Sequence, residues 1–371
     1  MANVCIIQRR LTHYRVPFFN ALRKTLERCG ISLKLLVGGG TPAEREKRDA
    51  SELPWAHTIP TIYLAGGRLC WQSIRHYIAD SDLVIVTQEN SLLYNHLLII
   101  APRRFKLAFW GHGANFQSCT PNGLKERFKR WEINRVDWWF AYTQLSADVV
   151  AAAGFPVERI TVVNNAIDIS ALQRQRLVVT PEETRALRES LGFSTGPVAV
   201  FVGSLYQAKR LEFLFSAAEK IRRRVQDFQL LLLGDGPDRD EVRKWCTKNL
   251  WARWAGTQFG KQKAGYLSLA QVMLNPGLVG LNILDSFACG LPLITTACGI
   301  HSPEIAYLEN GVNGVMVLDD LNEYVEATVR LMQDTDDLEL LRDGCFTSAK
   351  VYTMDNFCRR FAEGIVGALN V

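Results

Sequence analysis

The chain has 371 residues, 48% of them hydrophobic and 22% charged, which is ordinary for a globular protein and leaves ample apolar material for a core. Chains of this length usually divide into two domains. The net charge of +5 is too small to indicate a nucleic-acid-binding protein by itself.

The cysteines and the N-terminus indicate a reducing compartment. Nine cysteines are scattered along the chain without a Cys-x-x-Cys pair, so we expect them to be reduced and mostly buried. Residues 1–15 lack the pattern of a signal peptide, and no run of about 18 apolar residues could span a membrane. We therefore expect a cytoplasmic protein whose contact with a membrane, if any, is peripheral.

The first half of the chain alternates short apolar runs with helical patterns. The runs are almost continuously apolar, which is typical of strands that helices cover on both faces of a parallel sheet. A helical pattern occupies 17–30. We expect strands at 3–8, 32–40, 82–88, 105–113, 138–144 and 159–165.

A polar helical stretch, 172–193, connects this half to a second one with the same alternation. Repeated strand–helix alternation predicts an α/β fold made of two Rossmann-like, doubly wound parallel-sheet domains. In the second half we expect strands at 197–205, 228–236, 251–256, 271–275, 292–296 and 313–317, and helices at 209–224, 238–249, 261–269 and 280–289.

The stretch NPGLVGLNILDSFACGLPLITT, residues 275–296, carries the main binding signal. Pro276 and Gly277 turn the chain after a strand, and a helix starts near Gly280. The amides at a helix N-terminus form an anion site suited to phosphate, while Asp285, further along the helix, can reach sideways to hydroxyl groups. The alternative is that the glycines only permit close packing and that Asp285 only favours the helix start.

Seven stretches arrive in the order seen in a known family. They are LTHYRVPFF, FWGHG and VVNNAID in the first half, then FVGSLYQAKRLEFL, LLLGDGP, PGLVGLNILDSFACGLPLITT and GIHSPEIAYLENGVNG. From about residue 4 to 330 the chain resembles the retaining group-1 glycosyltransferases (glycosyltransferase family 4, GT-B fold) of bacterial envelope-polysaccharide clusters.

The resemblance implies two domains facing across a cleft. The N-terminal domain, 1–172, would bind the acceptor, and the C-terminal domain, 173–350, would bind a nucleotide-sugar. The last helix, 356–371, would pack back on the N-terminal domain.

The resemblance also implies roles for donor-side residues. Lys209 stands where the family's lysine holds the donor diphosphate, and a fixed cation can offset the charge of the leaving group. Ser204 occupies the place of a family arginine, for which Arg210 could compensate. Asp285 takes the second of two family glutamate positions. Gly277 takes the first and has no side chain, so the amides of Gly280, Leu281 and Asn282 could serve the sugar or phosphate instead.

Three further features concern catalysis and the acceptor. Glu304 either replaces the missing carboxylate or only begins a helix. His112, in a Gly-His-Gly loop, matches the family's histidine near the reacting sugar, where it would hydrogen-bond the sugar. The loop after the first strand would contact the acceptor or the donor phosphate, or would simply cap the first helix; its candidate residues are Arg10, His13, Tyr14 and Arg15.

No cofactor and no metal are expected. The three Asp-x-Asp matches, at 80/82, 238/240 and 334/336, fall at helix ends or within helical stretches rather than at strand ends. The expected partners are a nucleotide-sugar donor and a glycan or lipid-linked acceptor. A basic and aromatic helix around Lys125–Trp139 could also lie on an anionic membrane surface, or be an ordinary solvated face.

The predicted function is therefore retaining transfer of a sugar from a UDP- or GDP-linked donor, without a metal, in cell-envelope polysaccharide synthesis. Two alternatives stay open. The absent carboxylate at Gly277 and the absent arginine at Ser204 would suit a GT-B module that binds a nucleotide-sugar without turnover. A UDP-GlcNAc epimerase-like enzyme would need more carboxylates than this chain supplies.

Overall fold

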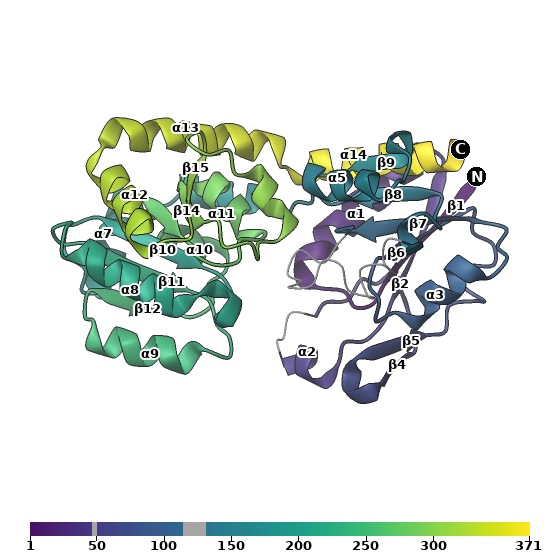
Figure 1. The fold of residues 1–371 in the computed structure, drawn as a ribbon, viewed down its shortest axis with the longest axis horizontal. Helices are drawn as coiled ribbons and strands as arrows, with labels where there is room; N and C mark the ends of the chain where they lie inside the picture. Colours follow the sequence, from purple (N-terminus) through teal and green to yellow (C-terminus); the bar gives the residue numbers. More distant parts are fainter. Residues whose placement is uncertain (47–49, 114–130) are drawn as a thin grey trace. The chain divides into compact units, whose positions relative to one another are not determined.

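The computed structural model describes residues 1–46, 50–113 and 131–371, and the chain divides into two compact units. Unit 1 comprises 1–167 together with 354–371, and unit 2 comprises 168–353. Each unit is built around its own parallel β-sheet (Figure 1). The prediction of two doubly wound α/β domains is confirmed.

Unit 1 has a seven-stranded sheet in the order β3-β2-β1-β6-β7-β8-β9, with every pair parallel. Its strands are β1 (Ala2–Gln8), β2 (Ile31–Val37), β3 (His57–Thr58), β6 (Leu83–Thr87), β7 (Lys106–Gly111), β8 (Trp138–Ala141) and β9 (Ile160–Val162). The sequence pattern predicted six of these strands but not the two-residue strand β3. It also missed the antiparallel hairpin of β4 (Thr61–Leu64) and β5 (Leu69–Gln72).

Helices cover both faces of this sheet. Helices α1 (Val16–Arg28) and α14 (Met354–Asn370) pack together on one face, where Phe18 stacks on Phe357 with ring centroids 4.2 Å apart. The other face buries Tyr94 and Ile99 of α3 (Leu93–Ile100) and Val150 of α5 (Gln144–Ala152). The remaining described helices of unit 1 are the short α2 (Pro42–Glu46), η1 (His13–Arg15), η2 (Ala65–Gly67) and η3 (Val157–Arg159).

Unit 2 has a six-stranded parallel sheet in the order β12-β11-β10-β13-β14-β15. The strands are β10 (Val198–Val202), β11 (Gln229–Leu233), β12 (Ala252–Trp254), β13 (Val272–Leu274), β14 (Leu293–Thr296) and β15 (Gly314–Val317). All six lie where the apolar runs predicted them. The sheet order reverses between β10 and β13, which is where open α/β sheets bind ligands.

The helices of unit 2 form two layers. On one face α8 (Leu211–Arg222), α9 (Arg239–Lys248) and α12 (Leu321–Gln333) close the main apolar core. The polar connection expected at 172–193 forms two helices, α6 (Ser170–Leu177) and α7 (Pro181–Ser190), both of which contact α10. The others are α10 (Gly260–Ser268), α11 (Asn282–Cys289), α13 (Thr335–Val351), η4 (Gln207–Lys209) and η5 (Pro303–Tyr307).

Candidate functional site

Lys209 is a buried cation at the carboxyl end of β10. The residue ends η4 and is 5% exposed, and its Nζ donates a hydrogen bond to the carbonyl oxygen of Leu278 at 2.5 Å. Burial lowers the pKa of the Lys209 ammonium to about 8. Within the described parts of the chain, no carboxylate comes within ion-pair distance of this Nζ. A buried ammonium that is held only by a carbonyl is a strong candidate for binding an anion.

Glycines bring backbone close to this lysine. Gly234, after β11, has a φ of +143°, and a Cβ built there would lie 1.8 Å from the carbonyl oxygen of Gly203. A Cβ on Gly203 would lie 3.5 Å from Lys209 Nζ. The loops after β10 and β11 therefore meet through backbone atoms, and the ammonium has backbone rather than a side chain on that side.

Gly277 has no room for any side chain. A Cβ at this position would lie 2.4 Å from the carbonyl oxygen of Ala208, and the neighbouring Leu278 amide donates to that same oxygen at 2.8 Å. The turn after β13 thus lies directly against η4 and places the Leu278 carbonyl on the lysine. A glutamate at position 277 would require this turn to move away from η4.

The start of α11 is only partly available to an anion. The Gly280 amide donates to Asn282 Oδ1 at 3.0 Å, so that bond must open before a phosphate oxygen can accept from Gly280. Leu281 is the N-cap residue and Asn282 is the first residue of the helix. Asp285, 6% exposed, lies in the first turn, and its Oδ1 accepts from Lys263 Nζ at 2.7 Å. Asp285 is therefore already paired with α10.

His301, which sequence reasoning missed, braces the same turn. The ring is 9% exposed, its Nδ1 accepts from the Val279 amide at 3.1 Å, and its Nε2 lies 2.7 Å from the carbonyl oxygen of Thr296. Because a carbonyl can only accept, Nε2 carries the hydrogen and Nδ1 is the acceptor. The position of His301 after strand β14 was the only local signal for it.

The other donor-side candidates lie around this centre. Arg210 has a left-handed backbone (φ +55°); its guanidinium pairs with Asp319, donates to Thr296 Oγ1 at 3.2 Å and lies over the Phe213 ring. Its charge is therefore already matched by a carboxylate. Ser204 is exposed in the loop after β10, and Glu304 is 3% exposed in η5.

In unit 1, His112 follows β7 and presents an exposed ring. The ring packs edge-on against Tyr142, with centroids 4.4 Å apart. Gly113, next in the chain, has a φ of +76°, and a Cβ there would lie 2.8 Å from Val150. The second glycine of the Gly-His-Gly loop is thus required by both conformation and packing.

The predicted acceptor-side residues separate into three environments. Arg15 is 8% exposed, donates to Asn165 Oδ1 at 2.9 Å and lies over the Trp110 ring at 4.8 Å, so it holds strand ends together. His13 and Tyr14 are exposed on η1, with ring centroids 5.9 Å apart. Arg10 lies beside Glu44, 3.4 Å from its Oε1.

Arg9, another residue that sequence reasoning missed, organises the end of β1. Its guanidinium forms two 2.7 Å hydrogen bonds to Glu44, and it also bonds Tyr63 and Glu89. The bonds from Arg9 lower the pKa of the Glu44 carboxyl to about 2. Its place directly after a strand was a signal, but partners 35 to 80 positions away could not be read from the pattern.

The basic and aromatic helix expected around Lys125–Trp139 is corrected in part. Residues 125–130 lie outside the described residues. Trp138 and Trp139 belong to strand β8, where they are 7% and 0% exposed, because the chain enters the sheet at that point. They cannot contribute to a membrane-facing helix.

Among the described residues, no three His, Cys, Asp or Glu side chains gather as they would around a metal ion. Of the three Asp-x-Asp matches, Asp334 caps α13 and Asp80 pairs with Lys34. Metal independence stays a prediction. None of the helices that the structure describes is long and apolar enough to cross a bilayer.

Two family descriptions match separate parts of the chain. Residues 18–171 match "Glycosyltransferase Family 4", and residues 196–334 match "Glycosyl transferases group 1". All but the last four residues of the first match lie in unit 1, and the second match lies in unit 2.

The chain is also similar to individual glycosyltransferases. Alpha-monoglucosyldiacylglycerol synthase of Acholeplasma laidlawii is 24% identical over 48% of this chain, and the match spans less than half (46%) of that relative. Two solved structures have the same GT-B fold at low identity. HepE of Anabaena, in complex with UDP-glucose, has a TM-score of 0.69 and 15% identity, covering 99% of this chain and 100% of its own. The lipopolysaccharide outer core galactosyltransferase WaaB has a TM-score of 0.69 and 16% identity, covering 98% and 99%.

Proposed function

Because the chain belongs to the group-1 glycosyltransferases of family 4, we propose that it transfers a sugar from a nucleotide-sugar to an acceptor hydroxyl with retention of configuration. The observation that carries the proposal is the buried Lys209 ammonium, which is bonded to the Leu278 carbonyl in the turn after β13 and lies beside Gly203 in the turn after β10. A donor diphosphate would supply the counter-charge that this cation lacks.

The donor is proposed to bind unit 2 without a metal. Lys209 and the amides of Leu281 and Asn282 hold the diphosphate, and Gly280 joins them once its bond to the Asn282 side chain opens. Asp285 accepts hydrogen bonds from the ribose hydroxyls while it remains paired with Lys263. A UDP-linked donor is supported by the complex of HepE with UDP-glucose.

The chemistry is proposed to need few protein acids or bases. The bond between the sugar and the diphosphate breaks, and Lys209 and the helix amides stabilise the leaving phosphate. The acceptor oxygen forms its bond from the same face of the sugar, and its proton passes to the departing phosphate oxygen. His112 is proposed to hydrogen-bond the sugar, and Glu304 is the candidate for the carboxylate that Gly277 cannot provide.

The acceptor is proposed to be a glycan or a lipid-linked saccharide of the cell envelope, used at the inner face of the cytoplasmic membrane. Two similar proteins support this: one named for lipopolysaccharide outer core transfer and one for synthesis of a glycosylated diacylglycerol. Arg10, His13, Tyr14 and Arg15 are the candidate acceptor-side residues; because Arg15 is buried, it would act by positioning the strand ends.

One structural feature favours a second candidate, a module that binds the donor without turnover. The turn at Gly277 excludes the first of the two glutamates usual in the family. Incubation with a panel of UDP- and GDP-sugars separates the two, because a transferase hydrolyses its donor slowly even without acceptor. If the wild-type protein releases free sugar and the Lys209→Met variant does not, the chain is an enzyme. If the wild-type protein binds the donor tightly but releases no sugar, the chain is a binding module.

A further inference from the structure

Asn275 is a fully buried side chain beside the Lys209 ammonium. It follows β13, and Pro276 comes next in the chain, which restricts Asn275 to an extended backbone. Its backbone amide donates to the carbonyl oxygen of Ile294 in β14 at 3.0 Å, and the residue is 0% exposed. The end of β13 and the neighbouring strand therefore hold Asn275 in place.

The side chain of Asn275 makes one hydrogen bond within the described part of the chain. Its Nδ2 donates to the carbonyl oxygen of Leu278 at 3.1 Å, whereas its buried Oδ1 has no partner there. Because a carbonyl oxygen can only accept, the group that faces Leu278 is the NH2 of the carboxamide. A buried polar atom without a partner lowers the stability of a protein. Stability of the fold alone therefore does not account for an asparagine at this position.

The carbonyl oxygen of Leu278 also accepts a hydrogen bond from Lys209. Nζ lies 2.5 Å from this oxygen, so Asn275 and Lys209 share one acceptor and occupy both of its lone pairs. When a diphosphate draws the ammonium toward itself, Lys209 gives up this bond, and Asn275 still satisfies the Leu278 carbonyl. If Asn275 were absent, the departure of the lysine would leave a buried carbonyl without a donor, which costs free energy.

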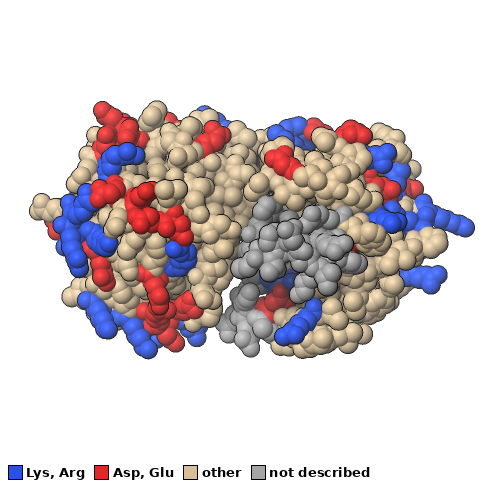
Figure 2. Space-filling model, viewed as in Figure 1, with Lys and Arg blue, Asp and Glu red and all other residues tan. Residues whose placement is uncertain are grey.

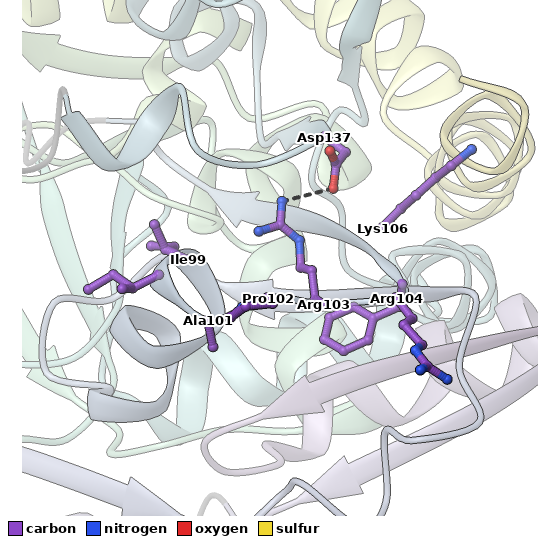
Figure 3. A pocket seen from close by; sticks show the side chains of 9 residues that line it. Ile99, Ala101, Pro102, Arg103, Arg104, Lys106 and Asp137 are labelled. Atoms are coloured by element: carbon purple, nitrogen blue, oxygen red, sulfur yellow. Dashed lines mark hydrogen bonds and ion pairs between the residues drawn. The ribbon is translucent and has the colours of Figure 1, made fainter.

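The contact of Lys209 with a carbonyl differs from the ion pairs of other cations in the molecule. Figure 3 shows a cavity of unit 1 in which the Arg103 guanidinium donates to Asp137 Oδ2 at 3.1 Å. Figure 2 shows Lys and Arg side chains beside Asp and Glu side chains on the visible face of unit 2. Arg210, at the same turn as Lys209, pairs with Asp319. Lys209 can leave its carbonyl without separating two opposite charges, which an ion pair does not allow.

We propose that Asn275 is a positioning residue of the donor site, which keeps the Leu278 carbonyl hydrogen-bonded while Lys209 transfers to the donor diphosphate. The inference rests on the proposed function and adds to it the group that makes the lysine available. An asparagine with a purely structural role stabilises the protein without nucleotide and acts independently of Lys209. An asparagine in the proposed role acts when nucleotide binds, and only through Lys209.

The test is calorimetric titration of UDP into the wild type, Asn275→Ala, Lys209→Met and the double variant. We expect Asn275→Ala to bind UDP about tenfold more weakly than the wild type, the effect of leaving one buried acceptor without a donor. In the Lys209→Met background the same substitution should change the affinity by less than about twofold, because no lysine has to leave the carbonyl. Equal losses in both backgrounds, or no loss in either, overturn the proposal. If Lys209→Met binds UDP like the wild type, the proposed function fails and this inference fails with it.

Asn275→Asp gives a second measurement, the pH profile of UDP binding. The aspartate keeps the shape of the side chain but cannot donate to Leu278, and it would pair with the nearby ammonium, since Arg210 and Asp319 already pair with each other. This pair raises the pKa of Lys209, so the lysine stays charged up to pH 9. UDP affinity should therefore be lower than that of the wild type at pH 7 and nearly constant from pH 7 to pH 9. A decrease as steep as that of the wild type would contradict the proposal.

Asn313, which is also 0% exposed and lies in unit 2, is the matched control. Its Nδ2 donates to the carbonyl oxygen of Tyr307 and to Ser348 Oγ, both at 2.9 Å. We expect Asn313→Ala to lower the melting temperature without nucleotide by more than Asn275→Ala does, and to leave the affinity for UDP unchanged. If the two alanine variants lose the same affinity for UDP, both asparagines are structural and the proposal is overturned.

Discussion

At the residue scale, the packing of the turn after β13 against η4 leaves no room for a side chain at position 277. Its backbone touches η4, and any Cβ would meet the Ala208 carbonyl at 2.4 Å. We expect Gly277→Ala to lower the free energy of unfolding by about 1–3 kcal/mol, because backbone atoms must move apart. The control is Gly265→Ala in α10, where the contact is an ordinary 3.6 Å, and urea denaturation should show it unchanged or slightly stabilised. Equal effects of the two substitutions would contradict this explanation.

His301 makes two hydrogen bonds that can be removed separately. Asparagine at 301 can keep the acceptor for the Val279 amide, whereas glutamine can keep the donor to the Thr296 carbonyl. If the brace on the turn at 278–280 matters for the donor, His301→Ala should weaken UDP binding about fivefold, the effect of one neutral hydrogen bond.

His301→Asn should then recover most of that loss and His301→Gln little of it, because the Val279 bond is the one that fixes the turn. Calorimetric titration gives the affinities, and the melting temperature without UDP reports general loss of structure. The same affinity in all four proteins would exclude a positioning role.

The pKa of Lys209 predicts a pH dependence of nucleotide binding. Burial holds this pKa at about 8, and a bound diphosphate would raise it by favouring the charged form. Binding is therefore strongest below pH 8, where the ammonium is charged before the ligand arrives. Affinity for UDP should fall about tenfold between pH 7 and pH 9, because above pH 8 the Lys209 amine is neutral in the free protein and must take up a proton when UDP binds.

The matched variants are Lys209→Arg, which stays charged across this range, and Lys209→Met, which never carries the charge. The affinity of both variants for UDP should change much less with pH, and the methionine variant should bind UDP weakly at every pH. A wild-type profile as flat as theirs would show that Lys209 does not face the bound phosphate.

At the element scale, helix α14 packs on one face of the sheet of unit 1. Phe361 is fully buried and stacks on Phe140 with centroids 4.3 Å apart, and it meets Trp110 edge-on at 4.9 Å. We expect Phe361→Ala to lower the free energy of unfolding of unit 1 by about 3–5 kcal/mol, whereas Val366→Ala on the exposed side of the same helix should cost under about 1 kcal/mol. Equal small losses in denaturation experiments would mean that α14 contributes little.

Helices and strands could be predicted from the sequence where a run of neighbouring residues is enough to indicate them. Most strands of unit 2 are nearly continuous apolar runs, β12 with its central Arg253 being an exception. The polar segments after the strands correctly indicated the edge of the sheet formed by the carboxyl ends of the strands. The hairpin β4–β5 was missed because its apolar residues alternate with exposed ones, among them Ile62 and Leu64. Side-chain partners were not predictable at all: neither the pairing of Arg9 with Glu44 nor that of Asp285 with Lys263 follows from a local pattern.

At the scale of the whole molecule, the two units have the same architecture but contain different chemistry. Unit 2 carries a buried cation beside glycine turns, and unit 1 carries an exposed histidine and a buried arginine. The sequence predicted the doubly wound fold through its alternation of strands and helices, whereas the donor-side role of Lys209 comes from the family resemblance and stays a prediction. It did not predict which polar groups are already bonded, because that depends on packing across the sheet.

Binding of a nucleotide diphosphate by Lys209 without a metal is the central claim of the proposed function. Calorimetric titration of UDP into the wild-type protein and into Lys209→Met, each at pH 7 in excess EDTA, tests it directly. We predict that the wild type binds UDP in EDTA and that the methionine variant binds about 10–100-fold more weakly, the effect of losing a charged hydrogen bond. Equal affinity in the two proteins, or wild-type binding that requires added magnesium, would contradict the account.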